Sequence, residues 1–397
     1  MTNLPQGWKM ETLGEILSSD KYSIKRGPFG SALKKSFFVE KGIRIFEQYN
    51  PINNDPHWKR YFISHEKFQE LEAFKATEGD LLISCSGTLG KIVELPKDTE
   101  MGIINQALLK IRLNNIKILN SYFIYYFNSP IMQEKILEST LGSAIKNIAS
   151  VKILKQIEIP LPPLKEQERI VGILDESFAK IDESIKILEQ DLLNLDELMQ
   201  SALQKAFNPL KDNAKENYKL PQSWEWKSLE EISENISAGG DKPKNCTESK
   251  TAKNQIPVYA NGVNNNGLVG YTDKATIIKP SLTISARGTI GFVCIRKEPY
   301  FPIVRLISLI PCENILCLHY LYFCLNFFIA KGEGSSIPQL TIPKFKSLQI
   351  PLPPLKEQEQ IAEHLDFVFE KAKALKELYT KELKDYEELK QSLLNKA

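Results

Sequence analysis

Residues suited to metal binding or catalysis are few in this chain of 397 residues, and they form no familiar motif. The densest group comprises three cysteines and one histidine, Cys312, Cys317, His319 and Cys324. Their spacing fits no common zinc motif, so we expect small buried side chains here and no metal site. The six cysteines contain no CxxC pair and no secretory signal precedes them, which favours free thiols in a reducing cytoplasm.

Residues 84–91, SCSGTLGK, resemble a phosphate-binding P-loop, which requires the pattern GxxxxGK[ST]. Cys85 stands where the first glycine belongs, and Ile92 replaces the serine or threonine. A related segment at 284–293, ISARGTIGFV, has Phe292 in the lysine position. We therefore predict no nucleotide binding, and interpret both segments as strand–turn–strand corners with polar residues at the rim.

The tetrapeptide DPHW at 55–58 is similar to the [D/N]PP[Y/F/W] signature of amino-methyltransferases, but it lacks the second proline. The four histidines are scattered and show no nucleophile–base pattern. We interpret the tetrapeptide as a turn, and we predict no catalytic residue and no bound cofactor in this chain.

An internal repeat organises the sequence. Residues 159–170, IPLPPLKEQERI, recur at 350–361 as IPLPPLKEQEQI, with 11 of 12 positions identical. Weaker matches keep the same order: 4–16 with 220–232, 83–92 with 284–293, and 121–128 with 319–326. The last match assigns the apolar run 315–330, which is too short to span a bilayer, to a helix in the core of a globular domain.

The repeat predicts four segments: a globular domain at 1–158, a long helix at 159–208, a second globular domain at 209–349, and a second long helix at 350–397. Prolines followed by acidic residues open both helices, as expected at the positive end of a helix dipole. The globular domains show short strands, such as 42–46, 79–84 and 108–112, separated by Gly, Pro and Asn. The predicted fold class is α+β, with two tandem mixed α/β domains.

Apolar residues recur at three- and four-residue spacing along both helices, which predicts an antiparallel coiled coil with pseudo-two-fold symmetry. Over residues 164–206 the first helix would extend about 64 Å at 1.5 Å per residue. The alternative is that each helix packs only on its own globular domain. The predicted seam residues are Leu174, Phe178, Ile181, Ile185, Leu188, Leu192, Leu195, Leu365, Val368, Ala372, Leu375 and Tyr379.

The formal net charge of +2 hides an uneven distribution. Residues 1–158 carry 21 Lys and Arg against 17 Asp and Glu, and residues 209–349 carry 17 against 12. The two helical segments carry 5 against 10 and 8 against 10. Two positive domains on a negative spacer suit a protein that places separate domains on a phosphate backbone.

Two kinds of segment are candidates for DNA contact. The glycine loops (residues 25–35 and 238–244) combine glycines, which permit close approach to a phosphate, with cations. The hairpin loops (residues 84–91 and 285–291) offer polar side chains for base edges. The predicted DNA-contacting residues are Lys25, Arg26, Ser31, Lys34, Lys35, Ser86, Thr88, Lys91, Lys242, Lys244, Arg287 and Thr289.

With the doubled PLPPLKEQE segment, the long helices and the GPFGS and SGTLG segments, the whole chain resembles the specificity subunit of type I restriction–modification systems. The resemblance implies two target-recognition domains, each binding one half of a bipartite double-stranded DNA site, and an antiparallel coiled coil that sets the spacing. It further implies two methyltransferase subunits that use S-adenosylmethionine, and restriction subunits that use ATP and magnesium. It implies a non-catalytic chain, and the free thiols and the short apolar run separately favour a cytoplasmic protein without a membrane partner.

Two alternatives remain from the residues alone. One is a stand-alone DNA methyltransferase or nuclease with unrecognised motifs. The other is a coiled-coil adaptor whose two globular domains bind proteins and not DNA.

Overall fold

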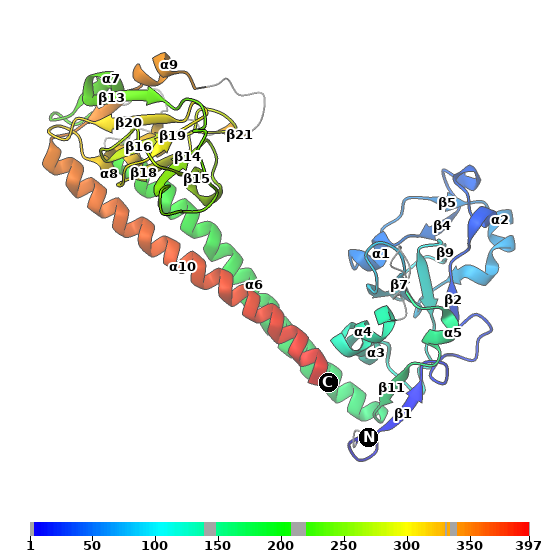
Figure 1. Ribbon diagram of the computed structural model, residues 1–397. Helices are drawn as coiled ribbons and strands as arrows, with labels where there is room; N and C mark the ends of the chain where they lie inside the picture. Colours follow the sequence, from blue (N-terminus) through cyan, green and yellow to red (C-terminus); the bar gives the residue numbers. More distant parts are fainter. Residues whose placement is uncertain (1–3, 139–147, 208–219, 330–331, 334–339, 397) are drawn as a thin grey trace. The chain divides into compact units, whose positions relative to one another are not determined.

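The computed structural model describes residues 4–138, 148–207, 220–329, 332–333 and 340–396. The chain forms two compact units: unit 1 is Met1–Ile187 with Lys381–Ala397, and unit 2 is Leu188–Thr380. Each unit therefore holds one globular part and a portion of both long helices, α6 (Leu164–Phe207) and α10 (Leu355–Lys396) (Figure 1). The fold class predicted from the sequence is confirmed.

The predicted four-segment division of the chain stays a prediction. Strand β11 (Glu158–Leu161) spans the proposed boundary after residue 158. The boundary after residue 208 lies outside the described residues.

Unit 1 contains a four-stranded antiparallel sheet and a five-stranded mixed sheet. The four-stranded sheet has the order β2 (Ile24–Arg26), β10 (Leu108–Ile111), β7 (Leu81–Ser84), β8 (Ile92–Glu94). The five-stranded sheet has the order β3 (Phe38–Val39), β5 (Phe62–Ile63), β4 (Ile43–Phe46), β9 (Gly102–Ile104), β6 (Lys75–Ala76). The α-helices are α1 (Tyr49–Ile52), α2 (His65–Glu70), α3 (Asn120–Asn128), α4 (Pro130–Glu138) and α5 (Val151–Leu154).

Unit 2 repeats this plan with a smaller second sheet. Its four-stranded sheet has the matching order β13 (Ser233–Ala238), β20 (Ile307–Pro311), β16 (Ser281–Ile284), β18 (Val293–Arg296). A three-stranded sheet has the order β15 (Leu268–Thr272), β14 (Ile256–Tyr259), β19 (Phe301–Pro302). A separate two-stranded sheet pairs β17 (Thr289–Ile290) with β21 (Gly332–Glu333). The α-helices are α7 (Leu229–Ile232), α8 (Leu318–Phe328) and α9 (Ile342–Lys346). A parallel pair joins β4 to β9 in unit 1 and β14 to β19 in unit 2, so the internal repeat is also structural.

The apolar run at 315–330 contains α8, which contributes five buried residues to the core of unit 2. The prediction of a core helix is confirmed. Over the described residues, no helix is both long enough and apolar enough to cross a membrane.

A fully buried glutamine fastens the start of α6 to the globular part of unit 1. The Gln167 amide nitrogen donates to the carbonyl oxygens of Lys117 (3.0 Å) and Pro162 (2.9 Å). Its amide oxygen accepts from the backbone N–H of Leu119 at 2.8 Å. Because all three partners are backbone groups, the glutamine satisfies donors and acceptors that burial would otherwise leave unpaired.

Unit 2 repeats this glutamine clamp at the start of α10. The Gln358 amide nitrogen donates to the carbonyl oxygens of Ile315 (2.9 Å) and Pro353 (2.8 Å), and its oxygen accepts from the N–H of Cys317 (2.9 Å). Both glutamines belong to the repeated PLPPLKEQE segment. The segment is thus repeated because it builds the same interior junction twice.

A short antiparallel pair completes each junction. Strand β1 (Lys9–Thr12) pairs with β11 in unit 1, and β12 (Glu225–Ser228) pairs with β22 (Gln349–Leu352) in unit 2. A tyrosine hydroxyl donates to each second strand: Tyr122 to Pro160 O (2.9 Å) and Tyr320 to Pro351 O (2.6 Å). The strand that leads into each long helix is therefore fixed on both sides.

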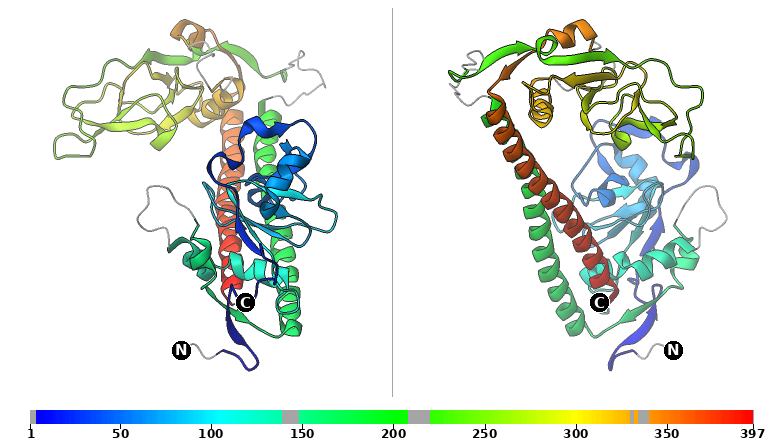
Figure 2. Two further views of the ribbon diagram at one scale, coloured as in Figure 1. Left: turned by 90° about the vertical axis from the view of Figure 1, so that its right-hand side faces the viewer. Right: turned by 60° about the vertical axis from the view of Figure 1, so that its left-hand side comes forward.

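Within each unit, α6 and α10 run antiparallel and lie side by side (Figure 2). In unit 2, Leu203 and Phe207 share a core with Leu365 near the start of α10, and Asp196 pairs with Lys376 farther along. In unit 1, Asp182 pairs with Lys390. From Asp182 to Asp196 the chain advances by as many residues as it goes back from Lys390 to Lys376. Both ion pairs are therefore consistent with one antiparallel register.

The seam of α6 follows the predicted heptads. Every seventh residue from Leu174 to Leu195 is buried, and the predicted residues between them (Phe178, Ile185 and Leu192) are partly buried. In α10, Leu365 and Ala372 are buried, and Val368 and Tyr379 are partly buried.

The assignment of Leu375 to the seam is wrong. Leu375 is 38% exposed, and Lys376 takes the inward position. The long apolar stem of a lysine can cover a seam while its ammonium group reaches solvent or a carboxylate. Here the ammonium group of Lys376 bonds to Asp196 of α6, and Lys390 repeats this arrangement with Asp182.

The glutamine clamp predicts a large and local stability cost. Replacing Gln358 by alanine leaves one N–H and two carbonyl groups at buried or partly buried bonds without this partner, which should cost about 2–5 kcal/mol. We expect the apparent Tm to fall by roughly 5–15 °C for Q358A. The matched control is Q360A, on the exposed face of the same turn, which should change Tm by no more than about 2 °C. Equal shifts for both variants would contradict the role of the clamp.

Candidate nucleic-acid interface

The two hairpin loops have the same backbone conformation. In unit 1, Ser84 N donates to Lys91 O and Gly90 N to Ser84 O, both at 2.9 Å. In unit 2, Ser285 N donates to Phe292 O (2.9 Å) and Gly291 N to Ser285 O (3.0 Å). Each loop joins two antiparallel strands, β7 to β8 and β16 to β18. The predicted strand–turn–strand corner is confirmed.

Each glycine loop contains one glycine beside which the fold leaves no room for a Cβ atom. A Cβ atom on Gly27 would lie 1.7 Å from the carbonyl oxygen of Asn105, and one on Gly239 would lie 2.6 Å from Ile303 N. This corrects the sequence-based explanation, because these glycines approach the protein's own backbone where a phosphate was expected. Gly30 and Gly240 face open space, with no atom within 4 Å of an added Cβ.

Among the predicted cations of unit 1, Lys25 and Arg26 are partly buried. The Lys25 ammonium group lies over the rings of Tyr22 (5.5 Å) and Phe74 (5.2 Å). The Arg26 guanidinium donates to Cys85 O at 3.5 Å, which links the glycine loop to the hairpin loop. Burial raises the pKa of the Cys85 thiol to about 12, so this cysteine is a neutral packing residue.

The other predicted residues of unit 1 are distributed over two places. Ser31, Lys34 and Lys35 are exposed along the short 3₁₀ turns that precede β3. Thr88 and Lys91 are exposed and Ser86 is partly buried in the hairpin loop.

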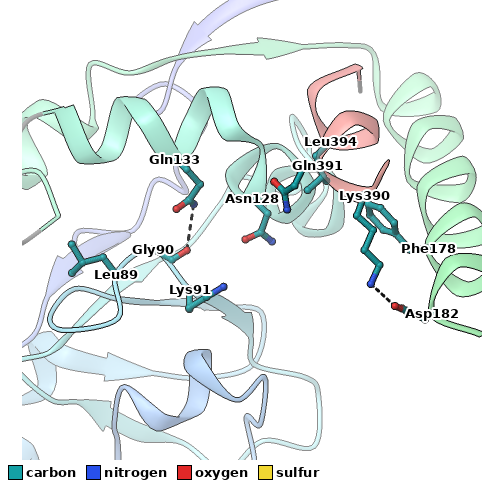
Figure 3. A pocket seen from close by; sticks show the side chains of 10 residues that line it. All are labelled: Leu89, Gly90, Lys91, Asn128, Gln133, Phe178, Asp182, Lys390, Gln391 and Leu394. Atoms are coloured by element: carbon teal, nitrogen blue, oxygen red, sulfur yellow. Dashed lines mark hydrogen bonds and ion pairs between the residues drawn. The ribbon is translucent and has the colours of Figure 1, made fainter. Parts of the chain in front are cut away.

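Lys91 lines a cavity of ≈ 530 Å³ that also includes Phe178 and Lys390 from the long helices (Figure 3). On the other side of the cavity, Gln133 of α4 donates to the carbonyl oxygen of Gly90 at 3.3 Å. This hairpin loop therefore rests against α4 and faces the helical portion of its own unit.

In unit 2 the predicted residues lie on separate loops. Lys242 and Lys244 are exposed after β13, and Arg287 is exposed at the tip of the hairpin loop. Thr289 is partly buried and belongs to β17, which pairs with β21. The assignment of all twelve residues to DNA contact stays a prediction.

Two residues of unit 2 that sequence patterns did not single out organise its hairpin loop. The Asn261 side chain donates to Val304 O (2.6 Å) and accepts from Ala286 N (2.8 Å), so it ties two loops together. Val304 and Arg305 adopt left-handed φ values of 53° and 60°. This conformation costs roughly 1–2 kcal/mol per residue outside glycine. An Asn-Gly pair at 261–262 signals a turn, but no residue type marks Val304 or Arg305 as left-handed.

Buried arginines hold the loops of both units against the sheets. In unit 2, the Arg296 guanidinium lies 3.5 Å from the centre of the Tyr259 ring and donates to Asn266 O at 2.5 Å. In unit 1, Arg44 lies 4.1 Å from the Phe46 ring and donates to the carbonyl oxygens of Pro56 (2.9 Å) and Trp58 (2.7 Å). Burial lowers the pKa of Arg44.

The DPHW tetrapeptide forms the expected turn. The Asp55 carboxylate accepts from the backbone N–H groups of His57 and Trp58, both at 3.0 Å. The Trp58 ring stacks on Tyr49 with centroids 4.3 Å apart. The Asp55 carboxylate therefore stabilises the turn through local hydrogen bonds.

The cysteine-rich segment is distributed over a core helix and its entry. Cys324 is fully buried in α8, and His319 Nδ1 lies 2.6 Å from an Asp366 carboxylate oxygen. All six cysteines are free thiols. Within the described part of the chain, no three His, Cys, Asp or Glu side chains gather in a way that could hold a metal ion.

The chain matches a family model described as type I restriction modification DNA specificity domain, twice, over residues 5–192 and 221–384. The type I specificity subunit S.MpnORF507P of Mycoplasma pneumoniae is 33% identical over 221 residues, which is 54% of this chain. The chain spans 56% of the length of that relative, and 66% of a second M. pneumoniae relative that is 31% identical over 56% of this chain. The MjaVIII specificity subunit of Methanocaldococcus jannaschii is 25% identical, over 80% of this chain and 78% of its own.

Solved structures share the fold. The HsdS subunit from Thermoanaerobacter tengcongensis aligns with a TM-score of 0.65 at 20% identity, over 99% of this chain and 97% of its own. A chain from a structure of a type I R-M system aligns with a TM-score of 0.78 at 20% identity, over 99% of this chain and 98% of its own.

The two glycines before Asp241 form a matched pair for testing the glycine loop. An alanine at Gly239 would collide with the backbone of Pro302 and Ile303, so G239A should destabilise the protein by about 1–3 kcal/mol or more. An alanine at Gly240 meets no atom and needs no left-handed conformation, so G240A should be neutral or slightly stabilising. Thermal unfolding of both variants checks this, and a comparable loss in G240A would contradict the explanation.

Proposed function

Because this chain belongs to the type I restriction modification DNA specificity family, we propose that it is the non-catalytic subunit that selects a bipartite DNA site for a type I restriction–modification complex. Each globular part binds one half-site. The long helices recruit two methyltransferase subunits, and restriction subunits join the same complex. S-adenosylmethionine serves the methyltransferase subunits, and ATP and magnesium serve the restriction subunits.

The observation that carries this proposal is that the two units share one framework but differ in their loops. Both units share one strand order and one glutamine clamp, while their glycine loops read GPFGS and AGGDK. The framework is what two domains of one function would share. The exposed loops differ as two domains that read different half-sites would. The positive charge of both globular segments supports phosphate contact.

Exposed apolar residues on the long helices support recruitment of two copies of one protein. Ile187 and Leu378 are each 55% exposed, and the sequence repeat makes them equivalent positions on α6 and α10. Leu198 and Leu389, also equivalent, are 52% and 44% exposed. Large apolar side chains on a solvated helix face are typical of interaction sites. Their repetition fits two methyltransferase subunits bound in equivalent ways.

The proposed function is tested by methylation with and without partners. The purified chain, mixed with S-adenosylmethionine and DNA, should transfer no methyl group. With its methyltransferase subunits, it should direct methylation to one bipartite sequence, and replacing residues 1–158 should change only one half of that sequence. Methyl transfer by the chain alone would favour the stand-alone enzyme. A reconstituted complex that shows no salt-dependent DNA binding would favour the protein-binding adaptor.

The proposed binding of methyltransferase subunits to the exposed apolar residues of α6 and α10 has its own test. We expect the double variant I187S/L378S to bind methyltransferase subunits at least about tenfold more weakly, since it removes apolar contact at two equivalent sites. Sedimentation analysis of the mixed subunits measures this. The control is K186S/K373S, which alters exposed lysines of the same two helices and should assemble normally. Normal assembly of I187S/L378S would contradict this assignment.

A further inference from the structure

The turn between β19 and β20 in unit 2 holds an arginine in a conformation that arginine rarely adopts. Arg305 has a φ of 60°, and the preceding Val304 has a φ of 53°. Arg305 is exposed, so burial of its own side chain does not account for this backbone. Observed strain that a surrounding framework maintains is grounds for a functional hypothesis.

Four hydrogen bonds maintain the turn. Val304 N donates to Gly240 O and Arg305 N to Gly239 O, both at 2.8 Å. Leu306 N donates to Ile303 O at 3.1 Å, and the Asn261 amide donates to Val304 O. The direction in which Arg305 leaves the backbone is therefore set by the glycine loop and by Asn261.

Asn261 also relates this turn to the hairpin loop. Its carbonyl oxygen accepts from Ala286 N, so one side chain contacts the residue before Arg287 and the residue before Arg305. Gly262 N adds a bond to the Ser285 hydroxyl at 3.3 Å. Two arginine-bearing loops are thus held in a fixed relation at one rim of unit 2.

The surroundings of Arg305 leave its guanidinium group accessible to the edge of a nucleic-acid base and offer it no carboxylate among the described lining residues. Arg305 lines an open cavity of ≈ 420 Å³, whose described lining residues include Gly239, Leu340 and Thr341 but no carboxylate. A guanidinium group presented on a fixed backbone can form two parallel hydrogen bonds to a planar acceptor pair.

Unit 1 has a corresponding turn that lacks both the arginine and the left-handed backbone. Gly27 N donates to Leu108 O (2.9 Å) as Gly239 N donates to Leu306 O (2.8 Å), so the frameworks match. Unit 1 places Gln106 and Ala107 in the turn, and neither is among the left-handed residues. The arginine belongs to one unit only, as a residue that reads one half-site should.

Resting on the proposed function, we propose that Arg305 reads a guanine in the half-site bound by unit 2, with Asn261 as its positioning residue. Arginine contacts guanine O6 and N7 in the major groove through paired hydrogen bonds. A phosphate contact needs only charge near the backbone, and a flexible surface lysine supplies that. The strained, braced turn supplies direction, which a base contact requires.

The experiment compares methylated sequences genome-wide for the complete complex carrying wild-type chain, R305A or R305G. Glycine adopts the left-handed conformation freely, so R305G keeps the turn while removing the side chain. Both variants should accept other bases at one G·C position of one half-site, with discrimination falling roughly 5- to 150-fold. The other half-site should stay unchanged. N261A should relax the same position, whereas a purely structural role would weaken recognition at all positions.

The control is K297A, which removes one positive charge from an exposed position of the same unit and should leave the recognised sequence intact. Unchanged discrimination in R305A and R305G would overturn the inference. So would a uniform loss of affinity with a reduced salt slope, since that result marks a phosphate contact. If the wild-type complex methylates no bipartite sequence, the proposed function itself fails, before any variant is compared.

Discussion

The rest of the structure depends on one buried amide at the start of each long helix. Gln167 and Gln358 each bond to two carbonyl oxygens and one N–H of the surrounding backbone. A helix anchored by its first turn to the interior of a globular part has a fixed direction relative to that part. Both the coiled-coil seam and the exposed loops therefore take their orientation within a unit from this clamp.

The clamp also explains why this string is the most strongly repeated one in the sequence. Its prolines end a strand, its glutamine is fully buried, and its first leucine (Leu161 or Leu352) lies in or against the core. Any change in the glutamine leaves buried polar groups unpaired, so the residue type has little freedom. Apart from Gly27 and Gly239, the glycine loops carry fewer constraints of this kind and differ between the units, which suits the specificity proposed for them.

Sequence patterns predicted what local periodicity and repetition encode: the two long helices, most of the α6 seam, the core helix α8 and the hairpin corners. They misassigned Leu375 because a lysine stem can occupy a seam, and residue-type patterns count only apolar side chains. They misjudged Gly27 because its neighbour, Asn105, is distant in sequence. The order of the strands and the left-handed pair Val304–Arg305 depend on hydrogen bonds between remote segments, so no local signal reports them.

Unit 2 shows how a shared framework can support a loop that its counterpart lacks. One backbone bond between the glycine loop and the neighbouring turn occurs in both units, from Gly27 N to Leu108 O and from Gly239 N to Leu306 O. Unit 2 adds the bonds of Val304 N and Arg305 N to the glycine loop, the Asn261 brace and two left-handed residues. At roughly 1–2 kcal/mol per left-handed residue, the pair costs about 2–4 kcal/mol, a sizeable part of the roughly 5–15 kcal/mol that stabilises a typical domain, so the hydrogen bonds around the turn must offset it. A rim of this kind can change its side chains, and its local backbone, without disturbing the clamp or the helices. Specificity can then diverge while the helical surface proposed for partner subunits stays constant.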